Sequence, residues 1–475
     1  MENIHLLQFL QEQTTLADFR AKSYIQDSHN HKRPKRNIFL RLKKYIDEFL
    51  DGNKKIRWVT MTWLRWSWKT TVLFQLYSQI DSSECYKLFL SLDTTHGLLG
   101  VSLYEVLTTY QTLLGMPYEN LDKPLILFLD EVQYDSTWWI ALKSLYDQSD
   151  KVFIFSTWSA ALILNTNADI ARRTVYEKMY PLSFTEYLKI AKEKYEIKWL
   201  GKNISDLILY SSSSDFLYNG LKNLEADINQ YYMGVMKSDF QKYLWYWSLP
   251  HMVDFDDESI VYDQIQKTLD RIIHSDLPMI KFHPDTISSI PWILYALADM
   301  DSCNVSKMAE KFWINRQKMS SILDALEWAE LLRRIYPYAS HLTQVTSKKP
   351  SKYLFSAPAF RAIYYRLMSN IISNENAKWK ITEDLVAMYF YKIFYSLLNW
   401  SLTYDNEQWG ADFILKTWDI SIVIEVWAWT KWYKQVIQTM KKVPSKYGIV
   451  ISEDNLEYNK EANIVKIPLR IFLLI

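Results

Sequence analysis

The chain has 475 residues, a length typical of two to four domains, and its 55 Lys and Arg against 54 Asp and Glu give a net charge of +1. Because positive and negative charges are almost equal in number, a general affinity for polyanions is not expected. Any nucleic-acid contact would have to come from a local patch. Two cysteines, Cys85 and Cys303, are too few for a disulfide framework and favour a reducing compartment. The sequence contains neither a signal-peptide pattern nor an apolar stretch long enough to span a bilayer. We therefore expect a soluble cytoplasmic protein that contacts no membrane.

Glycine and tryptophan occur in unusual numbers. The chain holds 9 glycines, about a quarter of the number expected at the usual frequency of about 7%, and 20 tryptophans. Together they make 29 of 475 residues, which would be an ordinary glycine frequency. Trp313, Trp328 and Trp418 stand where a turn or a helix end favours glycine. We hypothesise that many tryptophans are glycines in the protein made by its host, through a genetic code that reads UGA as glycine.

The alternative is a chain that is truly rich in tryptophan. Under the glycine hypothesis some tryptophans are still real, and we expect at least one of Trp138 and Trp139 to be so.

Residues 1–55 read as a polar helical segment that contains a basic run, "HKRPKRNIFLRLKK". This run is interpreted as a solvated helix face or as a nucleic-acid patch. Residues 56–185 alternate between apolar strands and amphipathic helices, which predicts a parallel α/β sheet. The predicted strands are "IRWVTMT", "YKLFLSLD", "PLILFLDE", "KVFIFST" and "TVYEKMYPL".

The rest of the chain changes character twice. Residues 186–282 are mostly helical and are predicted to form a lid, and residues 283–345 give three short helices and a wing, which is typical of a winged helix-turn-helix. Residues 346–475 combine a helix over 377–398 with strands in "ADFILKT", "ISIVIEV", "YGIVIS" and "ANIVKIP". The predicted fold class is therefore α/β, with five parts: an N-terminal helical segment, a parallel-sheet core, a helical lid, a winged helix and a C-terminal α/β part.

Residues 63–70, "WLRWSWKT", fit the phosphate-binding pattern Gly-x-x-x-x-Gly-Lys-[Ser/Thr] if residues 63 and 68 are glycine. Bare backbone N–H groups must turn around the β-phosphate there, and the helix that follows directs the positive end of its dipole at the anion. Lys69 would reach the β- and γ-phosphates, and the Thr70 hydroxyl would ligate Mg²⁺. A literal Trp68 would fill the cradle and exclude the nucleotide. The predicted nucleotide-binding residues are Trp63, Leu64, Arg65, Trp66, Ser67, Trp68, Lys69, Thr70 and Thr71.

The second half of this site is the apolar strand that ends in Asp130 and Glu131. Asp130 would hold Mg²⁺, directly or through water, and Glu131 would act as the general base toward the attacking water. The next predicted strand ends near Thr157 and Ser159, one of which would sense the γ-phosphate.

Arg172 and Arg173 are further candidates for contact with phosphate, in cis or across a subunit interface. Their alternative is a surface pair near a helix end.

Four segments together resemble a group of archaeal-type AAA+-like P-loop ATPases that carry a C-terminal domain of unknown function with a restriction-endonuclease-like fold. The resemblance covers essentially the whole chain and implies ATP binding, hydrolysis and a five-stranded core with the roles given above. The sequence departs from the family pattern at Trp63, Trp66, Trp68 and Trp158, where the family has or tolerates glycine or small residues. The segments are "TWLRWSWKTT", "LFLDEVQYDSTWWIALKSLYD", "IFSTWSAALIL" and "MYPLSFTEYL".

In the winged-helix segment, a helix over 305–312 is followed by a turn at 313–315 and a second helix that begins near Arg316. In a DNA-binding protein, Arg316, Gln317 and Lys318 would face the major groove. Alternatively, this part packs between its neighbours or binds another protein without touching DNA.

Residues 377–470 resemble the restriction-endonuclease-like fold, with Glu383 on a helix and Asp412 and Glu425 on paired strands over a metal. Active members of that fold carry a lysine two residues after the last acid, but position 427 is Trp here. Lys431 or Lys434 would have to reach in from the next segment. A catalytically silent fold or a specificity module is the alternative.

Three functions follow from these observations. The first is an ATP-driven switch, with ATP and Mg²⁺ as cofactors, that repositions the C-terminal parts. The second is an ATP-gated, metal-dependent DNA nuclease. The third is a scaffold that does not hydrolyse ATP because its P-loop is degenerate.

Overall fold

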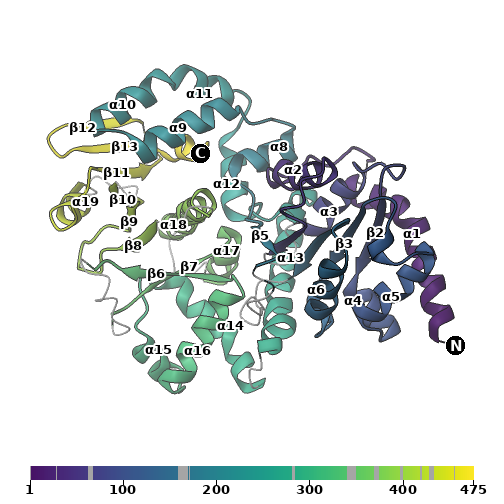
Figure 1. Ribbon diagram of the computed structural model, residues 1–475. Coiled ribbons are helices and arrows are strands. Elements are labelled where there is room, and N and C mark those ends of the chain that lie inside the picture. The colour runs from purple at the N-terminus through teal and green to yellow at the C-terminus, as the bar shows by residue number, and fades with distance from the viewer. Residues whose placement is uncertain are drawn as a thin grey trace. The chain divides into compact units, whose positions relative to one another are not determined.

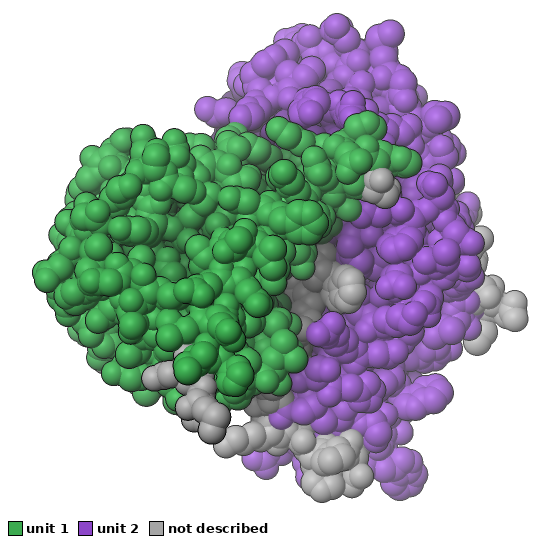
Figure 2. All heavy atoms as spheres, turned by 90° about the vertical axis from the view of Figure 1, so that its right-hand side faces the viewer, with its two compact units in different colours: residues 1–180 green, residues 181–475 purple. Residues whose placement is uncertain are grey.

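The computed structural model describes residues 2–27, 29–62, 68–158, 170, 172–280, 284–339, 349–368, 374–395, 400–417, 420–426, 433–453 and 455–475. The chain forms two compact units, residues 1–180 and 181–475, which Figure 2 colours green and purple. The finer division into five parts stays a prediction. Among the described helices, none is both long and apolar enough to cross a membrane.

The first unit is built on a five-stranded sheet in which every pair of neighbouring strands is parallel (Figure 1). Four of the five strands lie within the apolar runs that predict them, and β4 extends one residue beyond its run, to Trp158. Because the strands are parallel, their carboxyl ends meet at one edge of the sheet, which is where ligands bind in open α/β sheets. The strand order is β2 (Tyr86–Ser91), β3 (Leu125–Asp130), β4 (Val152–Trp158), β1 (Trp58–Thr62) and β5 (Val175–Lys178).

Helices of the first unit bury apolar side chains against this sheet. One core cluster joins Trp58, Leu127 and Ile154 of the sheet to side chains of the flanking helices, and each such buried side chain contributes about 1.5–3 kcal/mol. The helices are α1 (Glu2–Ile25), α2 (Ile38–Leu50), α3 (Lys69–Tyr77), α4 (Leu92–Leu99), α5 (Leu103–Leu114) and α6 (Trp138–Gln148), with 3₁₀ turns η1 (Tyr118–Asn120) and η2 (Val132–Tyr134).

The second unit begins with helices, as predicted for this region. The first of them is capped reciprocally, because the Ser183 hydroxyl accepts from the backbone N–H of Glu186 and the Glu186 carboxylate accepts from the backbone N–H of Ser183. The elements are α8 (Phe184–Lys192), α9 (Lys198–Tyr210), α10 (Ser214–Asn223), α11 (Glu225–Tyr232), α12 (Lys237–Trp245), η4 (Pro250–Asp254), α13 (Glu258–Arg271), η5 (Ile272–Asp276), η6 (Leu277–Ile280) and α14 (Pro284–Asp299).

The region predicted to be a winged helix contains α15 (Val305–Lys311), α16 (Arg316–Trp328) and β6 (Leu332–Pro337). Both predicted helices are present, and the first ends one residue before its predicted end. β6 pairs antiparallel with β7 (Lys352–Phe355) and parallel with β8 (Ser401–Tyr404). This hairpin therefore extends the C-terminal sheet instead of standing apart from it.

The C-terminal sheet has eight strands in the order β12-β13-β11-β10-β9-β8-β6-β7. After the helix over 374–393 come β8, β9 and β10, and each neighbouring pair of these strands is antiparallel. The helix over 433–440 follows, and then β11, which is parallel to β10. These elements are α17 (Pro358–Leu367), α18 (Asn374–Ile393), β9 (Phe413–Lys416), β10 (Ser421–Val426), α19 (Tyr433–Met440), β11 (Tyr447–Ser452), β12 (Glu457–Asn459), β13 (Ile464–Pro468) and α20 (Leu469–Phe472).

A buried ion pair fixes α18 against its neighbours. The Arg361 guanidinium of α17 donates from Nε to Asp384 Oδ2 at 2.6 Å and from Nη2 to Asp384 Oδ1 at 2.9 Å, and both side chains are buried. Asp384 Oδ1 also accepts from the backbone N–H of Phe355 in β7, at 2.9 Å. A bidentate pair in this surrounding tolerates little movement, because a buried charge without its partner is strongly destabilising.

Three described tryptophans have the left-handed backbone that favours glycine: Trp68 with φ 65°, Trp313 with φ 56° and Trp409 with φ 66°. A bulky residue is uncommon in this region because its Cβ approaches the carbonyl oxygen. The Trp313 side chain is also 97% exposed. The turn expected at Trp313 is therefore present.

At Trp328 the expected helix end is present, but the left-handed backbone that favours glycine lies elsewhere. Trp328 is the last residue of α16, and the left-handed residue after this helix is Glu330, with φ 57°. A glycine would thus be favoured two residues later than the sequence indicated. Trp418 lies outside the described residues.

Candidate nucleotide-binding site

The predicted phosphate-binding loop leads into α3, whose first residue is Lys69. Trp68 precedes this helix at the N-cap position, with φ 65° and ψ 30°. The loop residues Trp63, Leu64, Arg65, Trp66 and Ser67 lie outside the described residues. Thr71 is buried in the first turn of α3. The described part of the loop thus has the backbone of a glycine at residue 68 and a helix N-terminus directly after it.

Thr70 and Asp130 are brought together from α3 and the end of β3. The Thr70 hydroxyl donates to Asp130 Oδ2 at 2.6 Å, and the Thr157 hydroxyl donates to Asp130 Oδ1. Burial first, and then the neighbouring carboxylate of Glu131, raise the pKa of Asp130, while both hydroxyl hydrogen bonds act in the opposite direction. A nearby cation would favour the ionised form of this carboxyl group.

Glu131 follows Asp130 with a left-handed backbone, φ 55°, at the point where β3 ends. Its carboxylate lies 3.7 Å from the ammonium group of Lys69, and its backbone N–H donates to the Thr157 hydroxyl at 2.9 Å. The side-chain amide of Gln133 donates to the same carboxylate. Thr157 therefore links both acidic residues, and Gln133 is a positioning residue that sequence reasoning missed.

Lys69 also donates from Nζ to the backbone carbonyl of Trp158 at 3.2 Å. Trp158 is fully buried, with its ring 5.1 Å from that of Trp138. Within the described ranges, the buried indole N–H of Trp158 finds no hydrogen-bond acceptor. Trp138 packs against Trp58 as well, with a centroid distance of 6.1 Å. Trp138 therefore has the contacts of a core residue, whereas Trp158 leaves a polar group unsatisfied.

This donor set suits Mg²⁺ that arrives with a nucleotide. One carboxylate and one hydroxyl, already in contact at 2.6 Å, supply two oxygen ligands, and Mg²⁺ usually completes its shell with phosphate oxygens and water. Among the described residues, no group of three or more acidic, histidine or cysteine side chains could hold a metal ion alone.

At two positions, the basic run of the N-terminal segment fits neither of its two interpretations, a solvated helix face or a nucleic-acid patch. Arg36 is buried, and its Nη2 donates to the Tyr180 carbonyl at 2.7 Å, so it is neither solvated nor available to nucleic acid. The Arg33 guanidinium lies 5.1 Å from the ring of Trp68, and Gln75 of α3 donates to the Arg33 carbonyl at 3.0 Å. Tertiary contacts that the sequence does not reveal thus draw this segment to the start of α3.

The other residues of the first unit that were predicted to contact or sense phosphate say less about the site. Arg173 forms a bidentate ion pair with Asp147 of α6, with both nitrogen–oxygen distances 3.0 Å, and Arg172 is exposed. Ser159 lies outside the described residues. The structure thus brings together Lys69, Thr70, Asp130, Glu131 and Thr157, and their catalytic roles remain proposals.

A second charged cluster lies in the C-terminal sheet. The ammonium group of Lys352, in β7, lies 2.7 Å from Asp412 Oδ1 and 3.5 Å from Glu383 Oε2. Asp412 Oδ2 accepts from the backbone N–H of Val426 at 3.0 Å, and Glu425 Oε2 accepts from the backbone N–H of Asp412 at 3.2 Å. The three predicted acids do come together.

Lys352 is the residue that the sequence analysis missed. Lys434, one of the two lysines expected to reach this site, is exposed, and Lys431 lies outside the described residues. The sequence offers a lysine at the start of the apolar stretch "KYLF", and the structure shows that every residue of this strand is buried. Such a position indicates a charge that faces an internal partner.

The charges of this cluster influence one another. Burial first, and then the Asp412 carboxylate, raise the pKa of Glu383 to about 7. The same two causes raise the pKa of Glu425 well above its usual value. Burial alone would lower the pKa of Lys352, but the carboxylates of Asp412 and Glu383 outweigh it and raise that pKa. The ammonium group therefore stays charged between acids that are hard to ionise together.

The predicted DNA-contacting residues lie at the start of α16. Arg316 and Gln317 are exposed, and Lys318 is half-buried and donates its backbone N–H to the Asn315 side chain at 2.7 Å. Contact with DNA stays a prediction.

Comparison with solved structures gives only weak similarity. The chain matches PCH-2 from C. elegans with a TM-score of 0.28 at 14% identity, over 65% of this chain and 69% of that chain. It matches AMPPCP-bound DnaA from Aquifex aeolicus with a TM-score of 0.26 at 13% identity, over 63% and 90%. The Thermotoga maritima RuvB branch migration motor gives 0.25 at 13% identity, over 62% and 89%. With TM-scores of this size, none of these matches bears on function.

Comparison of sequences is more informative. Residues 56–188 match the AAA domain family, and this range contains the parallel sheet with Lys69, Thr70, Asp130 and Glu131. The match and the sheet order support a P-loop NTPase core and nucleotide binding. "Uncharacterized protein MJ1637" of Methanocaldococcus jannaschii is 33% identical over 462 residues, which span 96% of this chain and 92% of that protein. Residues 56–188 are thus similar to AAA domains, and the chain as a whole belongs to the same protein family as MJ1637.

Proposed function

We propose that this protein binds ATP with Mg²⁺, hydrolyses it, and uses the cycle to switch the conformation of its C-terminal parts. The observation that carries the proposal is the hydrogen-bonded set at the carboxyl edge of the sheet, in which the Thr70 and Thr157 hydroxyls both donate to Asp130 while Glu131 faces Lys69. These groups come from α3, β3 and β4, and only the parallel sheet brings them to one place.

Each residue has a role that its position supports. Lys69, at the N-terminus of α3, would bind the β- and γ-phosphates, and Thr70 and Asp130 would hold Mg²⁺. Bound Mg²⁺ would neutralise charge that develops on the phosphate oxygens. Glu131 would accept a proton from the attacking water, and Thr157 would keep Asp130 and Glu131 in register.

Bare backbone at residues 63 and 68 is a condition of this function. Trp68 already has the left-handed backbone that glycine adopts without strain, which supports glycine at this position in the protein made by its host. The buried and unsatisfied indole N–H of Trp158 supports the same replacement at the end of β4.

The switch would pass through the helix that follows the AAA sheet. The backbone N–H of Phe184, in α8, donates to the Tyr389 hydroxyl at 2.8 Å, and Lys392 lies 2.9 Å from Glu186. Both partners lie on α18, the helix that also carries Glu383. A displacement of α8 during the ATP cycle would therefore move α18 and with it the charged cluster of the C-terminal sheet.

ATP turnover by protein isolated from its host, or by recombinant protein with glycine at residues 63 and 68, tests the proposal. Lys69→Ala is expected to lower the rate of phosphate release by about 10²–10³-fold, because it removes a fixed charge at the transferring phosphoryl group. Lys44→Ala, which removes an exposed lysine of α2, is the matched control and should leave the rate unchanged. Equal rates for Lys69→Ala and the parent protein would overturn the assignment. An inactive parent would favour a non-hydrolysing scaffold.

A metal-dependent DNA nuclease is the second candidate, and the ammonium group of Lys352 beside Asp412 favours it. This lysine would supply the charge that β10 lacks two residues after Glu425. A divalent cation would have to displace the ammonium group from Asp412 before the carboxylates could bind it.

Cleavage of linear duplex and single-stranded DNA with Mg²⁺ or Mn²⁺, with and without ATP, tests the second candidate. Cleavage that is lost in both Asp412→Ala and Lys352→Met, while a Lys434→Met control still cleaves, would support it. If no cleavage occurs with either metal, the nuclease proposal is withdrawn and the cluster is structural. Thermal unfolding of each variant distinguishes lost chemistry from lost folding.

A further inference from the structure

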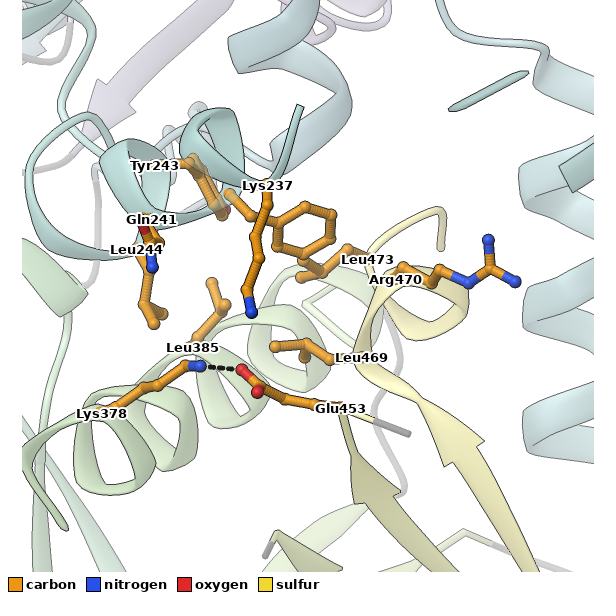
Figure 3. A pocket seen from close by; sticks show the side chains of 11 residues that line it. Lys237, Gln241, Tyr243, Leu244, Lys378, Leu385, Glu453, Leu469, Arg470 and Leu473 are labelled. Carbon is orange, nitrogen blue, oxygen red and sulfur yellow. Dashed lines mark ion pairs between the residues drawn. The ribbon is translucent and has the colours of Figure 1, made fainter. Parts of the chain in front are cut away.

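A cavity of about 290 Å³ lies within the second unit, between α12, α18, α20 and the residue that follows β11 (Figure 3). This volume is near the lower end of the range for small-molecule sites. Four of its lining side chains are buried leucines, which form an apolar floor. They are Leu244, Leu385, Leu469 and Leu473.

Aromatic rings complete the apolar part of the cavity. Phe240 and Tyr243 lie on α12, and the Tyr243 hydroxyl donates to the Leu182 carbonyl at 2.8 Å. Because the Tyr243 hydroxyl is already hydrogen-bonded to this carbonyl, Tyr243 lines the cavity mainly with its ring. The inner part therefore suits a hydrocarbon or aromatic body and would not satisfy a buried polar group.

The mouth of the cavity is cationic. Figure 3 shows Lys237 reaching over the cavity from the start of α12, with its ammonium group directed toward Lys378 and Glu453, which form an ion pair. Arg470 points away from this pair in the same view and donates to Asn229 at 2.9 Å. Two ammonium groups and one carboxylate thus remain at the mouth, which leaves one excess positive charge.

Lys237 is the group that carries this excess. Within the described ranges it forms no ion pair, and its side chain is exposed. Burial first, and then the charge of Lys237, lower the pKa of Lys378. The two ammonium groups therefore repel each other, and an anion between them would remove that repulsion.

We propose that this cavity is a binding site for a small monocarboxylate with an apolar body, whose carboxylate lies between Lys237 and Lys378 while its hydrocarbon or aromatic part rests on the leucine floor. A single negative charge matches the single excess positive charge at the mouth. The proposal does not depend on ATP hydrolysis. Since α18 lines the cavity with Lys378 and Leu385 and also carries Glu383, such a ligand would bind on the helix that supplies the charged cluster.

Isothermal titration calorimetry of the full chain tests the site with four probes: 4-phenylbutyrate, octanoate, 4-phenylbutanol and inorganic phosphate. The two carboxylates are expected to bind at one site per chain. 4-Phenylbutanol lacks the charge and phosphate lacks the apolar body, so each is expected to bind at least about tenfold more weakly. If the alcohol or phosphate binds as tightly as the carboxylates, the proposed recognition is wrong.

Variants locate the binding. Lys237→Met removes the charge but keeps most of the apolar stem. It is expected to weaken the binding of 4-phenylbutyrate by about tenfold or more. Lys202→Met, at an exposed residue of α9, is the matched control and should bind as the parent does. Leu473→Trp should fill the cavity and abolish binding. Because Leu473 is buried, the unfolding temperature of the Leu473→Trp variant is measured alongside, and Lys237→Met, at an exposed position, keeps the test decisive. Unchanged affinity in Lys237→Met, or no binding of either carboxylate to the parent, would overturn the proposal.

Discussion

Replacing Trp63 and Trp68 by glycine is expected to produce a protein that binds ATP with Mg²⁺, whereas the chain with both tryptophans is expected to bind none. Residue 68 has φ 65° and ψ 30°, and it precedes the first helical N–H groups that would contact phosphate. Glycine adopts this backbone without the cost of about 1–2 kcal/mol that a Cβ brings, and it leaves room for the β-phosphate oxygens. Calorimetric titration with ATP and Mg²⁺ measures the difference.

A matched control uses another tryptophan with the same backbone. Trp313→Gly relieves a left-handed tryptophan that is 97% exposed in the second unit, and it should not confer ATP binding on the chain that keeps Trp63 and Trp68. Protein from the native host should have an intact mass lower than that of the tryptophan chain by a whole number of Trp→Gly differences. Peptides from the host protein that contain tryptophan at 68, or a glycine double variant that binds no ATP, would contradict the assignment.

The second large effect is expected for Glu131→Gln. In a protein with glycine at 63 and 68, this change should lower kcat for ATP hydrolysis by about 10²–10⁴-fold, the usual contribution of a general base. The affinity for ATP should stay within a few-fold, because Lys69, Thr70 and Asp130 are retained. Single-turnover phosphate release and equilibrium binding separate the two quantities.

The same variant has a second readout that a structural role would not give. Since the Glu131 carboxylate is the second cause of the raised pKa of Asp130, its removal should lower that pKa, and Mg²⁺-dependent ATP binding should persist to lower pH than in the parent. Glu119→Gln, an exposed residue of η1, should change neither kcat nor this pH profile. A kcat for Glu131→Gln close to that of the parent would exclude Glu131 as the base.

Much of the first unit follows from local sequence. Apolar runs such as "LILFLD" become strands buried on both faces, and the lysine after the loop begins a helix, because strand and helix periodicity depend on neighbours a few residues away. Lys69, Thr70, Asp130 and Glu131 could be found in the same way, since each stands next to a predicted strand or helix end. The backbone at Trp68 and Trp313 agrees with the glycine hypothesis that composition and the positions of the tryptophans suggested.

Tertiary structure decided what depends on partners far along the chain. Lys352 finds Asp412 60 residues away, because β7 joins the C-terminal sheet through β6, and no local pattern indicates that pairing. Arg36, in a run that looks solvent-exposed, becomes buried because the Tyr180 carbonyl accepts its hydrogen bond. The sequence by itself indicated the strands of the first unit and the place of the predicted phosphate loop. Only the fold determined which charges are buried and paired, since burial is set by contacts between distant elements.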